Sequence, residues 1–445
     1  MISALIFLTL SVLWIILGTT YLKLHPFLTL LSASIFLAIG IGIPLEEIGP
    51  IIGKGFAKTF QSIGLLIIYG TIIGVILEKS YATQTIAQKL LKSLSVLPVP
   101  FIVSFIGYIV SIPVFCDSAF VILNSLNKSL SKKTKTPLIA LTVALSTGLY
   151  APHVLIPPTP GPLAAAANLE LENIFLLVLV GGFISFILIL VGAFYANYLS
   201  KTNPYVNIEE KNSKIYSSQE DLKKIGLPSF RKAISPILIP IFLMATGTLF
   251  PFSKEYSLLN FITQPVNALM IGMFFSFSLL SNRKLNIISK LIEEGIRNAA
   301  PILIITGMGG TLGLIIQQLP ISSYVDKIMI SPQFGIIIPF VISAALKTAQ
   351  GSSTVAIITT SSIIFPLLPM LEMESEMGKV WAIMSLGVGS MTVSHANDSY
   401  FWIVSQMGGL DIKTAYKTHT FATFLQGLSG LALILSGYNI WKMIV

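Results

Sequence analysis

The sequence predicts an all-α polytopic membrane protein, with about ten transmembrane helices and two re-entrant hairpins in two inverted-topology repeats. Three observations lead to this prediction. Of the 445 residues, 54% are hydrophobic and only 11% are charged, against roughly 25% charged in an ordinary soluble domain. Many stretches reach the ~20 apolar residues that a transmembrane helix needs. Finally, one long polar segment divides the chain into two halves of the same plan.

Ten apolar stretches are expected to cross the membrane. The first lacks a basic leader and a small-residue cleavage site, so it is expected to be kept as a span and not removed as a signal peptide. The expected spans of the first half are residues 2–22, 26–43, 61–78, 138–155 and 173–198. Those of the second half are residues 234–250, 264–280, 300–319, 379–395 and 422–444.

Two further apolar stretches, residues 99–131 and 335–370, are broken in the middle by polar residues and proline. Each is expected to form a hairpin that enters and leaves the membrane on the same face. With the N-terminus outside, most of the 28 basic residues then fall on the inner side, as the positive-inside rule requires. The net charge of +9 therefore reports topology and does not indicate nucleic-acid binding.

The polar segment separates residues 1–199 from residues 234–445 by a cytoplasmic linker, residues 200–233. Each half holds five spans, and because five is odd, the second half should lie upside down relative to the first, as in many secondary carriers. A weak sequence pattern agrees with this plan. Two glycines and a threonine recur 240 residues later: Gly55, Gly70 and Thr71 as Gly295, Gly310 and Thr311.

Four places in the chain should hold non-helical backbone at membrane depth, where only protein or a water-filled cavity can cover it. They are the two hairpin turns, near residues 113–118 and 347–354, and two helix breaks, near residues 152–162 and 394–399. Inverted-repeat carriers build a midplane site from such parts, and exposed helix N-termini there hold anionic groups. The candidate substrate-binding residues are Lys347, Gln350, Gly351, Ser352, Ser353, Thr354, Thr159, Ser394 and Asn397. The hydroxyls could instead bond back to the preceding helical turn.

Lys347 stands in an apolar segment, where inserting a lysine costs at least about 2.5 kcal/mol. It could be a counter-charge for a substrate carboxylate or a partner for Asp117 or Asp398. The alternative is that its long side chain snorkels to the outer interface.

Four ionisable residues at the turns and breaks are candidates for proton coupling: Asp117, Asp398, His153 and His395. A buried carboxylate without a partner could bind and release a proton near neutral pH, although Asp117 could also cap a helix. The histidines could relay protons or bond freed backbone groups. His25 and His419 lie at expected span ends and are given no chemical role.

No cofactor and no metal is expected. The group His395, Asn397 and Asp398 offers too few ligands for a convincing metal site, and a single cysteine, Cys116, excludes a multi-thiolate site. An intramembrane enzyme, the rival class, would need a nucleophile with its base. Ser394, His395 and Asp398 are close in sequence but match no known enzyme signature.

Three segments, residues 115–120, 346–356 and 394–402, resemble the gluconate permease family, a branch of the ion transporter superfamily. The proline-rich run 153–162, the Thr-His-Thr segment 418–420 and the chain length extend the resemblance over nearly the whole chain.

The resemblance implies symport of gluconate or a related small sugar acid with protons into the cytoplasm, across the bacterial cytoplasmic (inner) membrane. Members of that family also take fructuronate and D-serine, so the alternative substrate is another small hydroxy acid or D-serine, and the alternative coupling ion is sodium. The expected partners are thus a small anionic substrate, protons and the lipid bilayer. The wider superfamily further implies a homodimer in which hairpin-bearing domains move against a scaffold.

Overall fold

The computed structural model describes residues 2–203, 227–249, 256–280, 284–316, 318, 335–396 and 398–444, and every regular element in these ranges is helical. The first half comprises α1 (Ile2–Thr20), α2 (Pro26–Gly40), α3 (Leu45–Lys79), α4 (Ala82–Ser93), α5 (Val99–Ser111), α6 (Cys116–Thr134), α7 (Leu138–Leu155), α8 (Pro160–Asn168) and α9 (Ile174–Thr202).

The second half follows a similar order. It comprises α11 (Phe230–Leu249), α12 (Ser257–Thr263), α13 (Pro265–Phe277), α14 (Leu285–Ile316), α17 (Ile337–Gln350), α18 (Ser353–Ile364), a 3₁₀ turn (Phe365–Leu367), α19 (Glu376–Met391), α20 (Ser399–Gly408), α21 (Ile412–Ala415), a π-helical turn (Tyr416–Thr420) and α22 (Phe421–Ile444). Most of the expected linker lies outside the described residues.

Six helical stretches of the described chain are long and apolar enough to cross a membrane, or seven if α12 and α13, bent by 73° at their junction, form one span. Shorter apolar helices, among them α2, α5, α17 and α18, accompany them. The chain is therefore an all-helical protein with several membrane-spanning helices, while the number of ten spans stays a prediction.

The two long helices α3 and α14 begin earlier than the sequence predicted. α3 has 35 residues, which at 1.5 Å per residue makes it about 52 Å long, against about 30 Å for the hydrocarbon core. The expected spans 61–78 and 300–319 covered only the apolar parts of these helices. Exposed charged residues such as Glu46 and Lys54 continue α3 beyond its apolar part, because glutamate and lysine are good helix formers.

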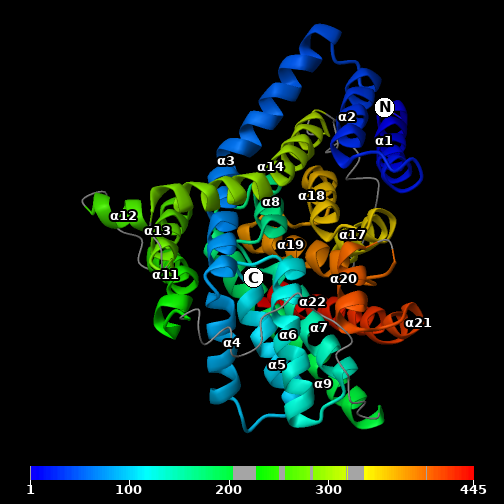
Figure 1. The fold of residues 1–445 in the computed structure, drawn as a ribbon. Helices are drawn as coiled ribbons and strands as arrows, with labels where there is room; N and C mark the ends of the chain where they lie inside the picture. Colours follow the sequence, from blue (N-terminus) through cyan, green and yellow to red (C-terminus); the bar gives the residue numbers. More distant parts are fainter. Residues whose placement is uncertain are drawn as a thin grey trace.

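α3 and α14 cross closely and join the two halves of the chain (Figure 1). Glycine makes the crossing possible: a Cβ atom on Gly55 would lie 2.6 Å from the Cα atom of Thr311. On the other side of the crossing, a Cβ atom on Gly295 would lie 2.8 Å from the Cα atom of Ile72. Figure 1 also shows α11 to α13 at one side of this pair and α1 and α2 near the end where α3 begins.

Both hairpin segments fold into two short helices joined by a tight turn. α5 and α6 are connected by residues 112–115, and α17 and α18 by Gly351 and Ser352. Gly351 has φ +76° and ends α17, a left-handed backbone conformation that glycine adopts without steric cost.

The two helix breaks lie between α7 and α8 and between α19 and α20. The first break, residues 156–159, lies inside the predicted range 152–162, and α7 continues through Pro152 and His153 to Leu155. The helix ends before Pro157 and Pro158, which have no N–H to donate, and α8 then starts with Pro160 at its first position, where proline is favoured. The second break, residues 392–398, lies where the sequence predicted it.

Candidate functional site

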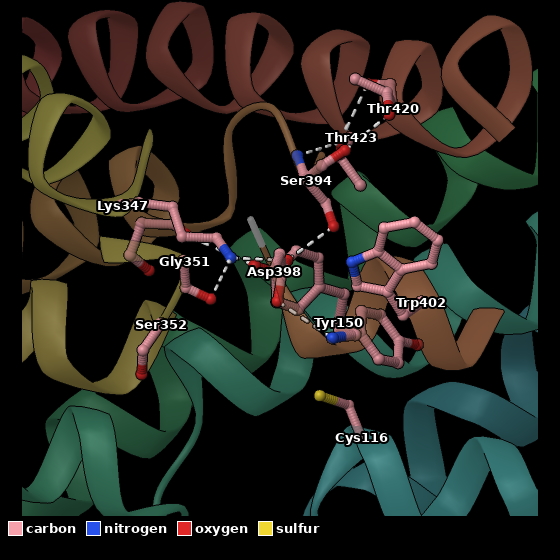
Figure 2. A network of polar contacts seen from close by, with 12 residues as sticks. Cys116, Tyr150, Lys347, Gly351, Ser352, Ser394, Asp398, Trp402, Thr420 and Thr423 are labelled. Atoms are coloured by element: carbon pink, nitrogen blue, oxygen red, sulfur yellow. Dashed lines mark hydrogen bonds and ion pairs between the residues drawn. The ribbon is translucent and has the colours of Figure 1, made fainter. Parts of the chain in front are cut away.

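The turn of the second hairpin and the second helix break meet at a buried ion pair. Lys347, one turn before the end of α17, places its Nζ 2.5 Å from Oδ2 of Asp398, the residue that precedes α20. Only 1% of the lysine side chain and 5% of the aspartate side chain are exposed. Figure 2 shows the two side chains pointing toward one another beside Gly351 and Tyr150. The snorkelling alternative is therefore wrong for this structure.

The Lys347 ammonium group has partners besides Asp398. It donates to the carbonyl oxygen of Gly351 at 3.1 Å, and the ring centroid of Tyr150 lies 5.9 Å from Nζ, within the range of a cation–π interaction. In this conformation Lys347 is thus held by Asp398, Gly351 and the Tyr150 ring.

Asp398 is equally well satisfied. Its Oδ2 accepts a second hydrogen bond from the Ser394 hydroxyl at 2.6 Å, and its Oδ1 accepts the backbone N–H of Tyr400 at 3.0 Å. The bond from the Tyr400 N–H makes Asp398 the side-chain cap of α20. Buried charges are tolerated only with such complete pairing, and removal of one partner leaves the other uncompensated.

The three hydroxyl residues that follow Gly351 are half-buried at the start of α18. Ser352 accepts the N–H of Val355 at 3.3 Å and so caps the helix. Ser353 hydrogen-bonds the hydroxyl of Tyr150, and Thr354 stands in the first turn. The side chain of Gln350 and the whole of Asn397 lie outside the described residues.

Asp117 lies in the first turn of α6, whose N-cap residue, Phe115, offers no side-chain bond. No ion pair involving Asp117 occurs in the described part of the chain; its Oδ1 accepts only a weak bond from the Cys116 thiol at 3.7 Å. It is nevertheless close enough to Lys347 and Asp398 to interact electrostatically with both. The unpaired carboxylate of the first hairpin thus faces the paired one of the second half.

Thr159 and His153 belong to a different part of the site. Thr159 is buried, and its hydroxyl donates a hydrogen bond to the carbonyl of Ile156. It also lines a small cavity between α3 and the first hairpin turn. The His153 ring lies 5.9 Å from that of Phe115, and its buried Nδ1 has no partner among the described residues.

His395 lies inside the second break, half-buried, and bonds the backbone of Thr348. Its buried Nε2 has no partner in the ranges that the structure covers. Those same ranges hold no group of three or more His, Cys, Asp or Glu side chains suited to a metal ion.

Sequence reasoning missed two members of the site. Tyr150, from α7 of the first half, covers Lys347 of the second half. His419, expected at a span end with no role, is fully buried and bonds Ser394. No local sequence signal marks either residue, because each reaches the site only through the packing of distant helices.

The chain is similar to known transporters along its whole length. The family model described as GntP family permease matches residues 3–441. An uncharacterized permease of Haemophilus influenzae is 33% identical, over 93% of this chain and 88% of its own length. A gluconate permease of Pseudomonas aeruginosa is 26% identical, over 96% and 95% of the two chains. The D-serine transporter DsdX of Escherichia coli is 29% identical, over 96% of both.

A solved structure has the same fold. The YdaH transporter of Alcanivorax borkumensis, whose crystal structure is described as having an unusual topology, aligns with a TM-score of 0.68 at 13% identity, over 94% of this chain and 99% of its own. With the apolar helices and the buried charge pair already described, these comparisons establish that the chain is a membrane transporter and belongs to the GntP family of permeases.

Proposed function

We propose that this permease is a secondary active carrier that brings gluconate or a related small sugar acid into the cytoplasm together with protons, across the bacterial inner membrane. One observation supports it above the others: a fully satisfied Lys347–Asp398 pair lies beside an unpaired carboxylate, Asp117, where a hairpin turn meets a helix break. The relatives named as gluconate permease and inner membrane permease support the substrate class and the location.

The anionic end of the substrate fits the start of α6. Ser352 and Asp398 cap α18 and α20 with their own side chains, whereas the cap position of α6 provides no side-chain bond. The start of α6, without a side-chain cap, and the positive end of its dipole suit a carboxylate. Once Asp117 is protonated, it no longer repels that carboxylate, which gives a physical reason for joint binding of proton and substrate. The half-buried hydroxyls of Ser353 and Thr354 suit sugar hydroxyls.

D-serine is the second candidate, and the 29% identity with DsdX favours it. Its ammonium group would neutralise Asp117 directly, so a zwitterion would need no proton on that carboxylate. The two substrates therefore predict different coupling.

The test of the proposed function is uptake by the purified protein in liposomes. An inward proton gradient should drive accumulation of intact labelled gluconate above the external concentration, and unlabelled sugar acids should compete. Stronger competition by D-serine, with accumulation independent of the proton gradient, would favour the second candidate. Equilibration without accumulation would indicate a channel, and conversion to a new compound would indicate an enzyme.

We propose further that residues 1–199 and 234–445 are inverted repeats, since the contacts of the α3–α14 crossing nearly exchange under the 240-residue offset. Gly55 adjoins Thr311, and Gly295 adjoins Ile72, next to Thr71. Exposed Lys133 and Glu374 follow the hairpins of the first and second half. Cysteines placed singly at these positions in a Cys116→Ser background should react with an impermeant maleimide from opposite sides of the membrane. Labelling from the same side would refute the inversion.

Lys347→Met should abolish uptake and lower the unfolding temperature, because Asp398 would remain as a buried charge without its counter-charge. Breaking such a pair typically costs about 3–5 kcal/mol. Adding Asp398→Asn should restore much of the stability but not the uptake. Lys442→Met is the matched control: its pair with Glu372 is partly exposed, with 24% and 58% of the two side chains accessible, and should be worth less than about 1 kcal/mol. Equal stability of the two single variants would contradict the buried pair.

Asp117→Asn should lose accumulation driven by a pH gradient yet keep exchange of internal for external substrate. Asparagine resembles the protonated carboxyl group in shape but cannot release a proton, and exchange requires only that the loaded site reorients. Counterflow and gradient-driven uptake measured in the same liposomes separate the two steps. If both activities fall together, Asp117 is a substrate ligand or a structural residue; full accumulation would remove it from the coupling step.

A further inference from the structure

His419 is a buried histidine that the site described so far does not explain. It lies in the π-helical turn Tyr416–Thr420, which leads into α22. Both of its ring nitrogens face serine hydroxyls: Nε2 is 3.1 Å from Oγ of Ser394, and Nδ1 is 3.0 Å from Oγ of Ser146. The ring of Tyr400 packs against it edge-on, with 5.6 Å between centroids.

The π-helical turn determines which way this histidine points. Turns with i→i+5 bonding are rare in proteins, and those that occur are often found at functional sites. Here the turn buries Thr418 and His419 while Lys417 stays exposed. A polar ring is thus turned into the protein at the level of the second helix break.

The same segment holds Ser394 by its backbone. The N–H of Ser394 donates to Oγ1 of Thr423 at 2.9 Å, and its carbonyl accepts from Oγ1 of Thr420 at 2.6 Å. Figure 2 shows Ser394 between these threonines and Asp398. With the backbone fixed on both sides, only the direction of the hydroxyl group is left to be set.

Counting hydrogens assigns that direction. A serine hydroxyl has one hydrogen, and Ser394 gives it to Asp398 Oδ2 at 2.6 Å. Its contact with His419 must then be as an acceptor, so Nε2 carries the hydrogen and donates. A neutral imidazole with its hydrogen on Nε2 accepts at Nδ1, and the Ser146 hydroxyl, 3.0 Å away, can donate there or to the carbonyl of Val143 at 3.1 Å.

We propose that His419 is a positioning residue of the transport site: it holds the Ser394 hydroxyl on Asp398 and so keeps Asp398 in place for its ion pair with Lys347. This inference rests on the proposed proton-coupled transport. The other titratable groups that face Asp398 are Lys347 from α17, Tyr150 from α7, Cys116 and Asp117 from α6, Tyr400 from α20 and His395 from the break itself. Of these only Lys347 forms an ion pair with it in the described residues.

The first test compares pH profiles of gluconate uptake for the wild type, His419→Phe, Ser394→Ala and the double variant, in liposomes. Because His419 is proposed to act only through Ser394, both single variants should shift the pH of half-maximal uptake in the same direction. The double variant should show no further shift, because His419 has no route to Asp398 once the Ser394 hydroxyl is gone. His419→Gln, which can supply an N–H donor, should shift the profile less.

A change of uptake rate at an unchanged pH profile in His419→Phe would overturn the proposal, since a merely structural residue would act in that way. His25→Phe is the matched control. His25 caps α2, is exposed and belongs to no described contact of the ion pair, and the control should keep the wild-type profile.

A second test needs no substrate and decides the inference even if the wild type carries none of the compounds offered. Melting temperatures of the same four proteins in detergent form a double-mutant cycle. If His419 acts through Ser394, the double variant should lose no more stability than the worse single variant. Additive losses would mean that His419 only packs. Failure of uptake in the wild type, by contrast, would count against the proposed function alone.

Discussion

A buried charge pair is the constraint on which the site depends. The Lys347 and Asp398 side chains are almost fully shielded from solvent, so the protein must supply their hydrogen-bond partners. The carbonyl of Gly351, the face of Tyr150, the Ser394 hydroxyl and a backbone N–H at the start of α20 meet that demand. The pair therefore fixes the second hairpin turn, the second break and α7 relative to one another.

Neither half of the chain completes the site alone. Tyr150 of the first half lies over Lys347 of the second. Asn168, at the end of α8, donates to the hydroxyls of Ser361 and Ser362 in α18, and Gln426 of α22 donates to the carbonyls of Thr147 and Leu188. Hydrogen bonds of this kind, with the glycine-lined crossing of α3 and α14, join the two halves. In the proposed coupling, the unpaired Asp117 is the group that changes its charge while this framework stays intact.

Local chemistry explains why the sequence predicted some boundaries well and others poorly. A glycine ends one helix, and a capping serine directly after it begins the next. Gly351 and Ser352 form such a pair, so the second hairpin turn was located correctly. The first break lies inside the predicted range 152–162, and the pair Pro157 and Pro158, not Pro152, ends α7. The long helices were predicted too short because hydropathy detects lipid contact and not helix length. Charged residues at the exposed end of α3 leave its backbone bonding intact.

By itself, the sequence determined that this protein is helical, lies in a membrane and has polar residues at two turns and two breaks, because those properties depend on composition and on the local effects of glycine and proline. It also offered Asp117 and Asp398 as partners for Lys347. Only the tertiary structure decided that Asp398 is the partner, and only the tertiary structure brought in Tyr150 and His419. The reason is physical: a buried polar atom must find a partner somewhere, but which helix supplies it depends on the packing of segments that lie apart in the sequence.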